Sequence, residues 1–257
     1  MTNWLDPVRG VLDDLPHPAV FFFRDDDAGW EDQRLFHLLD TFAAHNLPID
    51  LAVIPVALTS ETGRELLRRM EAAPDRVRVH QHGYAHTNHE PQGRKCEFGP
   101  SRDRAAQQSD IEQGRRRLQK VFGPHIDPIF TPPWNRCTAA TGQCLAELGF
   151  AVLSREAGAA PLSEPGLTEL FITHDWFAHR KGVRLTREEW GRKLATEIRV
   201  GTRTGIMLHH AVTDRNELRD IADLAALLAS HPWAQCETMN SIALGAQHAH
   251  LCRIMPR

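Results

Sequence analysis

Short apolar runs recur along this chain, and a cluster of polar or charged residues directly follows each of five of them. The clusters occupy residues 24–27, 80–89, 131–136, 174–176 and 209–210. Stretches in which apolar residues recur at helical spacing separate the runs, which is typical of βα units in a parallel sheet or barrel. In such folds the chemistry is carried at the carboxyl ends of the strands. We therefore expect an α/β fold in which the five clusters lie at one end.

The pattern predicts about seven strands with helices between them. Strands are expected at residues 20–23, 49–55, 77–79, 126–130, 150–153, 169–172 and 204–208. Helices are expected at residues 32–45, 60–70, 110–122, 138–149, 186–200 and 214–228. Thr186 and Glu189 fit a capping box, and Asp214 fits an N-cap. No repeat or low-complexity linker divides the pattern, so residues 1–257 are expected to form a single domain.

Composition argues against several classes of protein. The formal net charge is −3 and the pI is about 6.6, without a basic stripe, so we expect no nucleic-acid or anionic-membrane partner. No apolar run approaches the roughly 18–20 residues of a membrane span, and the first residues lack the basic and apolar regions of a secretory signal. The five cysteines form neither a CxxC pair nor a disulfide framework. We expect a cytoplasmic protein, although the mature part of an exported precursor would share these features.

Three adjacent carboxylates, Asp25, Asp26 and Asp27, directly follow the first apolar run. Adjacent carboxylates repel one another and destabilise the fold unless a cation balances them, and Arg24 can balance only one. The alternative is a solvated acidic turn or a helix N-cap. Their place after a Phe-rich strand favours metal binding or acid/base chemistry.

Four of the 15 histidines fall between residues 80 and 89. His82 and His86 are four residues apart, so on a helical turn both imidazoles lie on one side and can share a metal ion. His80 shares a face with His82 if the segment is extended, and His89 lies beyond the pair. The alternative is a group of core or loop histidines that hydrogen bonds satisfy.

The segment at 131–136 contains adjacent prolines, which stiffen it. Trp134 could form the wall of a pocket or stack on a sugar ring, and Arg136 could supply a charge. A rigid turn with a packing tryptophan is the alternative.

Two later segments complete the set. Asp175 could orient a histidine, and Trp176 could line the pocket, or both could belong to a polar loop with packing aromatics. His209 and His210 follow an apolar strand, and their side chains point to opposite sides if the strand continues. One of them could therefore serve as a general acid beside a metal.

The order of these clusters resembles that of the polysaccharide deacetylase superfamily of metal-dependent carbohydrate esterases, over roughly residues 18–215. That family carries an Asp-Asp pair after its first strand and a His-x-x-x-His motif after its third, matched here by the segment from His82 to His86. An Arg-x-Pro-Tyr/Trp-like segment, an Asp/Trp segment and a late Leu-x-His strand complete its pattern.

The resemblance implies an irregular (β/α) barrel of about seven strands and a metal-dependent hydrolase. It places the pair at Asp26, as the base that activates water, and Asp27, as a metal ligand with His82 and His86. A register shifted by one residue would use Asp25 and Asp26 instead. His210 matches the late acidic histidine better than His209 does. Tyr84, Trp134, Asp175 and Trp176 become candidate substrate-binding residues, and Arg24, Asp25, Arg136 and His209 candidate supporting residues.

The implied cofactor is one divalent metal ion, Zn²⁺ or otherwise Co²⁺, Ni²⁺ or Mn²⁺. The implied reaction removes an acyl group from an N-acylated, sugar-like substrate. Hydrolysis of another C–N bond, in a small amide or ureide, needs the same ligands, and a non-catalytic saccharide-binding relative would keep the barrel. One departure from the family stands out, because Thr131 occupies the position of the Arg that holds the catalytic Asp. That role must pass to Arg24, to Arg136 or to no residue.

Overall fold

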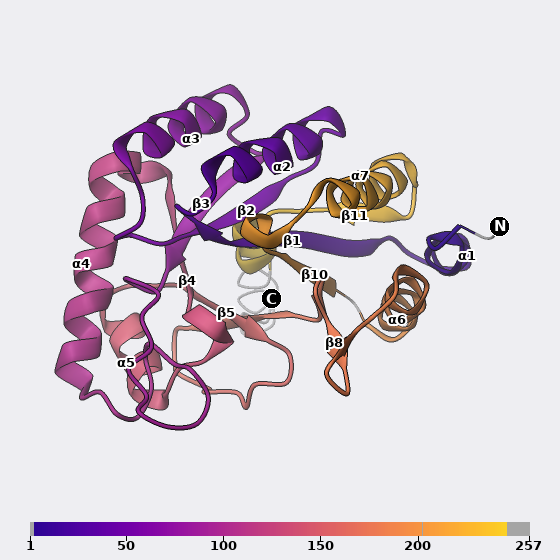
Figure 1. The fold of residues 1–257 in the computed structure, drawn as a ribbon. Coiled ribbons are helices and arrows are strands. Elements are labelled where there is room, and N and C mark those ends of the chain that lie inside the picture. Colours follow the sequence, from indigo (N-terminus) through magenta and orange to yellow (C-terminus); the bar gives the residue numbers. More distant parts are fainter. Residues whose placement is uncertain (1–2, 202, 246–257) are drawn as a thin grey trace, which may run out of the picture.

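The computed structural model describes residues 3–201 and 203–245, which contain a parallel sheet wrapped by helices (Figure 1). The main path of the sheet has the order β6-β5-β4-β3-β2-β1-β10-β7, and each neighbouring pair is parallel. These strands are β1 (Ala19–Ala28), β2 (Ile49–Val53), β3 (Val77–His82), β4 (Ile126–Thr131), β5 (Val152–Glu156), β6 (Thr168–Ile172), β7 (His174–Asp175) and β10 (Arg203–Leu208). All seven predicted strands are present.

The sheet nearly closes into a barrel because β7 follows β6 after a single residue and pairs with β10. Thr173 donates its amide N–H to the carbonyl of Gly205, and Trp176 donates to that of Met207. The two ends of the strand path are therefore joined through β10. The predicted irregular (β/α) barrel is confirmed.

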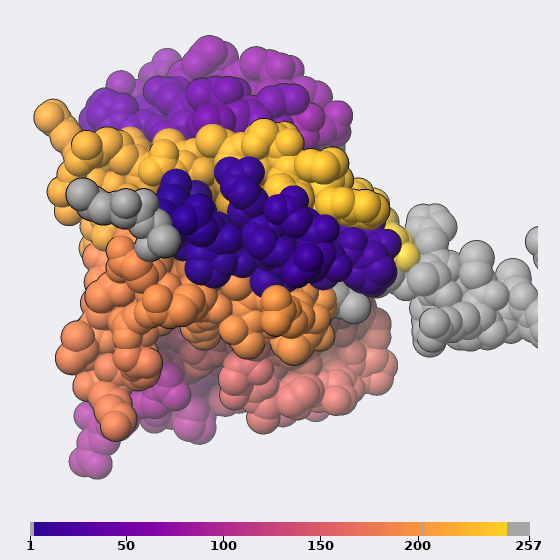
Figure 2. Space-filling model, turned by 90° about the vertical axis from the view of Figure 1, so that its right-hand side faces the viewer, coloured from indigo at the N-terminus to yellow at the C-terminus, as the bar shows by residue number. Residues whose placement is uncertain are grey.

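Helices cover the outside of the barrel (Figure 1). They are α1 (Asp6–Asp13), α2 (Asp32–Ala44), α3 (Ser60–Ala72), α4 (Arg104–Phe122), α5 (Ala139–Glu147), α6 (Arg187–Val200) and α7 (Arg215–Ser230). The capping box of Thr186 with Glu189 and the N-cap Asp214 are present as predicted. Helix α1, indigo in Figure 2, lies across the surface against α6. None of the helices in the described ranges is long and apolar enough to cross a bilayer.

Alternation along the strands separates an outer core from an inner one. Phe21 and Phe23 of β1 pack outward against the helices, while Phe22 between them packs inside the barrel with Met207 of β10. The same alternation carries onward along β1, so Arg24 and Asp26 face the interior and Asp25 faces outward. The polar site is thus built on the inner face of the strands.

The segment after β11 (Ala234–Cys236) fills the other end of the barrel. Met239 and Ile242 pack into the inner core. Asp50 of β2 is fully buried and accepts a hydrogen bond from the amide of Met239 at 3.0 Å. The barrel is therefore filled by apolar side chains at this end, which leaves the carboxyl ends of the strands for chemistry.

Several boundaries differ from the prediction. Strand β1 continues to Ala28, so the three aspartates lie inside a strand and not in a turn after it. Helix α4 begins six residues before its predicted start because Asp103 caps it, and Thr59 caps α3. Helix α1 and the hairpin of β8 (His179–Arg180) and β9 (Val183–Arg184) were not predicted.

The four cysteines in the described ranges are free thiols, and Cys252 lies outside those ranges.

Asp50 gives the fold a measurable pH dependence. Burial raises the pKa of Asp50 to about 8, with the nearby Asp127 adding to the effect and the Met239 amide opposing it. Between about pH 4 and pH 8 the folded chain therefore holds a proton that the unfolded chain releases, so stability falls as pH rises. We expect wild type to lose on the order of 4 kcal/mol relative to Asp50→Asn between pH 5 and pH 8, at about 1.4 kcal/mol per pH unit. Chemical denaturation at pH 5 and pH 8 measures this difference, and a parallel trend in both proteins would contradict it. The exposed Asp75→Asn variant is the control.

Candidate functional site

Three side chains at the carboxyl end of the barrel form a candidate metal centre. Oδ1 of Asp27 lies 3.3 Å from Nε2 of His82 and 3.2 Å from Nε2 of His86. The three candidate ligand atoms all lie within 4.8 Å of one another. Oδ1 of Asp27 is buried, and no donor in the described part of the chain is aligned to bond it. One carboxylate and two imidazoles are a donor set suited to Zn²⁺ and similar cations, so the residues fit the implied metal.

The backbone brings these ligands together by irregular conformations. Asp27 has φ 72°, where the pairing of β1 with β2 shifts register. His82 ends β3, and its Nδ1 donates to the carbonyl of Thr131 at 3.0 Å, which leaves Nε2 directed at Asp27. His86 follows on a tight turn with φ 55°. The two histidines converge as predicted, but from a strand end and a left-handed turn instead of a helical turn.

The charges of the three groups are mutually adjusted. Burial would raise the pKa of Asp27, but the close approach and the charge of the His82 ring hold it well below its usual range. Burial would lower the pKa of His82, and Asp27 raises it. Burial, together with the charge on His82, lowers the pKa of His86 to about 4. His86 is therefore neutral at pH 7, as a metal ligand must be.

Arg24 lies at the centre of the barrel and binds Asp26 with two hydrogen bonds. Nε donates to Oδ1 at 2.7 Å and Nη2 to Oδ2 at 2.9 Å, and the guanidinium is fully buried. It also donates to Ser154 on β5 at 2.8 Å and to Asn135 in η2 (Pro133–Asn135) at 2.7 Å. Burial would raise the pKa of Asp26, but the charge of Arg24 lowers it below the usual value. Arg24 thus supplies the guanidinium that Thr131 cannot.

Strand phase separates the two adjacent histidines after β10. Met207 pairs with Arg24 and Leu208 with Asp25, so continuing alternation places His209 on the inner side and His210 on the outer side. The half-buried ring of His209 lies 6.2 Å from that of Phe177, and its charge lowers the pKa values of Asp26 and Asp27. His209 therefore faces the carboxylates of the site.

His210 is instead locked behind the site. Its Nδ1 donates to Oδ2 of Asp25 at 2.6 Å, its amide donates to Oδ1 at 2.9 Å, and its Nε2 donates to the carbonyl of Trp30 at 2.7 Å. Burial would lower the pKa of His210, but the charge and hydrogen bond of Asp25 raise it to about 9. Both ring nitrogens are thus occupied, and the side chain is fully buried. The structure does not leave His210 a nitrogen for a substrate, which corrects the preference for it over His209.

Two tryptophans flank His86 of the candidate metal centre. The ring of Trp134 lies 4.5 Å from the His86 ring, and that of Trp30 lies 4.8 Å from it on the loop after β1. Trp30 is 39% exposed, so part of its ring remains open to a ligand. Trp134 was a predicted pocket residue, whereas Trp30 was not predicted because a lone Trp after a strand carries no functional pattern.

The side chains of three other candidates make their contacts outside the candidate metal centre. Trp176 is fully buried in the outer core between Trp4 and Trp190, so it does not line a pocket, contrary to the prediction.

Tyr84 packs against the core under α4, and its hydroxyl lies 3.4 Å from Gln113. Arg136 donates to the carbonyl of Lys95.

Asp175 keeps a place near the site. It pairs with Met207 in register, so its side chain is on the inner side of the sheet with His209. Its Oδ1 accepts a hydrogen bond from the amide of Phe177 at 2.8 Å.

The buried partners of the site were the residues that sequence patterns missed. Asn135 lay within a predicted cluster, but Ser154 and Glu97 lay outside all of them. Glu97 is fully buried and accepts hydrogen bonds from the turn that carries His86. Such contacts depend on which distant segments meet, and no local spacing records that.

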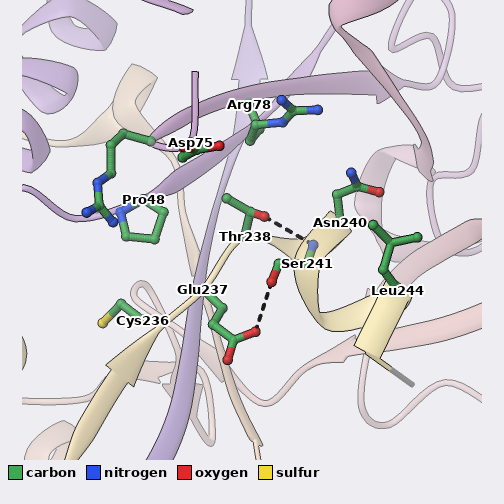
Figure 3. Close-up of a pocket in the computed structure, with 10 residues that line it drawn as sticks. Pro48, Asp75, Arg78, Cys236, Glu237, Thr238, Asn240, Ser241 and Leu244 are labelled. Carbon is green, nitrogen blue, oxygen red and sulfur yellow. Dashed lines mark hydrogen bonds between the residues drawn. The ribbon is translucent and has the colours of Figure 1, made fainter. Parts of the chain in front are cut away.

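A separate pocket of about 430 Å³ opens near the amino ends of β2 and β3 (Figure 3). Its polar groups are bonded among themselves: Ser241 donates to Glu237 through its hydroxyl and to Thr238 through its amide. Arg78 at its edge is paired with the buried Asp127. The pocket lies at the opposite end of the strands from the metal ligands, and none of its lining residues belongs to the site.

Comparison with known proteins agrees with this geometry. A family model described as polysaccharide deacetylase matches residues 8–153. A solved structure from Mycobacterium smegmatis, assigned to the polysaccharide deacetylases, superposes with a TM-score of 0.72 at 17% identity, covering 95% of this chain and 94% of that chain. No curated protein matches the chain significantly.

Two further solved structures share the fold. A family 4 acetyl xylan esterase from Clostridium thermocellum, in complex with a cobalt ion, has a TM-score of 0.57 at 13% identity, covering 89% of this chain and 92% of that chain. A peptidoglycan deacetylase from Bacillus subtilis has a TM-score of 0.57 at 11% identity, covering 93% and 98%. At such low identities the likeness concerns the fold alone.

Removal of the imidazole ligands is expected to abolish metal binding. Purified wild type should hold about one equivalent of a divalent metal after reconstitution, and the double variant His82→Ala/His86→Ala should hold almost none, because only Asp27 remains. Elemental analysis measures this directly. His89→Ala, an exposed histidine in the same segment, is the control and should retain the metal. Equal metal in the double variant and wild type would show that the cation binds elsewhere.

Proposed function

We propose that this chain, which belongs to the polysaccharide deacetylase family, is a metal-dependent hydrolase. It would remove an acetyl group from the nitrogen of a sugar-like substrate. The observation that carries the proposal is the position of Asp26 beside the Asp27, His82 and His86 set, with Arg24 fixing its orientation. A base adjacent to a metal centre is the arrangement that hydrolysis by activated water requires.

Asp27, His82 and His86 would hold the divalent ion, for which we propose Zn²⁺, with Co²⁺, Ni²⁺ and Mn²⁺ as alternatives. When bound, such an ion supplies Lewis-acid polarisation of the acyl carbonyl and lowers the pKa of water. The hydrogen bond from His82 to the Thr131 carbonyl fixes the tautomer that leaves Nε2 available.

Asp26 is assigned as the general base. Its lowered pKa keeps it ionised at neutral pH, and the two hydrogen bonds from Arg24 fix the plane of its carboxylate. A buried, oriented carboxylate can accept a proton from water without first breaking a hydration shell. Because Arg24 is held in turn by Ser154 and Asn135, Asp26 cannot swing away from the centre.

His209 is assigned as the acid that protonates the leaving nitrogen. It is only partly buried, faces the inner side and lies close enough to Asp26 and Asp27 to lower their pKa values. Asp175 is on the same side of the neighbouring strand β7, so we assign it the role of orienting the His209 ring. His210 anchors the loop of Trp30 from behind and takes no direct part.

The substrate is proposed to bind between Trp30 and Trp134. Aromatic faces beside a polar centre suit the apolar face of a sugar ring, and both rings contact His86. The ammonium of Lys95 lies 6.0 Å from the Trp134 ring, at the edge of this opening. Small amides or ureides would use the same centre without needing both rings.

The activity itself gives the test of this function. We expect wild type with metal to release acetate from N-acetylglucosamine oligomers, and Asp26→Asn to lose at least about 100-fold in kcat while retaining its metal. Asn keeps the size of Asp but cannot accept the proton. Asp75 is an exposed carboxylate just before the amino end of β3, whereas His82 is at the other end, so Asp75→Asn should keep wild-type activity. Hydrolysis of small amides alone would favour the alternative substrate class, and full activity in Asp26→Asn would refute the assigned base.

The adjacent histidines give a second test. His209→Gln should lower kcat by about 100-fold or more with little change in KM or in the melting temperature, because a proton donor is lost from a partly exposed position. His210→Gln should instead lower the melting temperature, because Asp25 is left buried with its charge unpaired. Steady-state kinetics and thermal unfolding of both variants separate the roles. An unchanged kcat in His209→Gln would show that another residue protonates the leaving nitrogen.

A further inference from the structure

We infer that Glu97 is a positioning residue that shapes the turn carrying His86 and so sets the affinity of the metal centre. The inference rests on the proposed function, because it concerns the same cation. Glu97 lies eleven residues after His86 in the same long connection between β3 and α4, and it is fully buried.

One carboxylate binds the backbone on both sides of His86. Oε1 of Glu97 accepts from the amide of Ala85 at 2.8 Å and from that of Thr87 at 3.4 Å. Oε2 accepts from the amide of Tyr84 at 3.2 Å. His86 thus sits between two residues that are fixed to the same side chain.

The turn needs such an external support. Gly83 has φ 53° and His86 has φ 55°, so two left-handed residues lie within four positions. For a residue other than glycine that conformation is strained, and it persists only where the surroundings enforce it. Without Glu97 the amides of the turn lose their acceptor, and His86 can relax away from Asp27.

Burial makes the coupling strong in both directions. Removing a carboxylate from water is costly unless donors replace the water, and here backbone amides of the turn do so. The energy is recovered only when the turn has the shape that points His86 at the metal centre.

Gly83 and the loop of Glu97 fit against each other closely. A Cβ atom on residue 83 would collide with Oε2 of Glu97 and would lie 2.6 Å from the ring of Pro133. The loop itself is fixed, because Cys96 donates its amide to Asn88 at 2.9 Å and its thiol to the carbonyl of Arg136 at 3.4 Å. The carboxylate is therefore held from behind as well as from the turn.

The test is the affinity for Co²⁺, measured by competition with a chromophoric chelator and by the visible spectrum of the bound ion. We expect Glu97→Ala to raise the Kd by ten- to hundredfold and to alter the spectrum. Glu97→Gln should recover part of that loss, because its carbonyl oxygen still serves Ala85 and Thr87. Gly83→Ala should weaken binding in the same direction, which keeps the test decisive if Glu97→Ala does not fold.

Glu90→Gln is the matched control. Glu90 lies in the same loop and accepts hydrogen bonds from the amide and hydroxyl of Ser101, but it does not hold the His86 turn. Its Kd should equal that of wild type. Wild-type affinity in folded Glu97→Ala, or in Gly83→Ala if Glu97→Ala does not fold, would overturn this inference alone. Failure of wild type to bind Co²⁺ would overturn the proposed function, and this inference with it.

Discussion

A buried guanidinium at the centre of the barrel organises the polar end of this molecule. Arg24 is fully buried, so each of its donors must find an acceptor, and it finds them on Asp26, Ser154 and Asn135. These partners come from one neighbouring loop and from strands on opposite sides of the barrel. The position of the base is thus tied to the closure of the whole sheet, and a local change at any partner would leave a buried donor of the guanidinium without its acceptor.

Because side chains alternate between the inner and outer faces of a strand, consecutive residues here have different roles. On β1, Arg24 and Asp26 face inward, Asp25 faces outward, and the register shift turns Asp27 toward the histidines. On β10 the same phase puts His209 inward and His210 outward, where Asp25 holds it. The outer pair anchors the Trp30 carbonyl, and the inner set presents the carboxylates. One strand pair therefore carries both the proposed chemistry and the support behind it.

The fold was largely predictable because its signals are local. Apolar periodicity gave all seven strands, and the capping residues Thr186 and Asp214 marked two helix starts. The order of polar clusters indicated the family, which is confirmed. Helix α1 escaped prediction because its apolar face is short, and α4 was begun too late because Asp103 was not taken as its cap.

The site was predictable only in part, because its finer roles depend on contacts between distant residues. The metal ligands follow a spacing that sequence records, and the structure brings the three predicted residues together. The choice between His209 and His210 depends on the phase of β10 against β1, which a single residue shift reverses. Trp176 was predicted to line the pocket, yet it is buried because Trp4, from the amino-terminal segment, packs onto it. Glu97 carries no pattern at all.

The most direct measurement is an anomalous difference map from crystals of the wild-type protein grown with Zn²⁺ or Co²⁺, collected at the absorption edge of the metal. The account predicts one strong peak bounded by the carboxylate of Asp27 and the Nε2 atoms of His82 and His86, about 2.0–2.2 Å from each. Asp26 should lie beside that peak with its carboxylate still bound by Arg24. A peak at other residues, or none at this centre under saturating metal, would contradict the account.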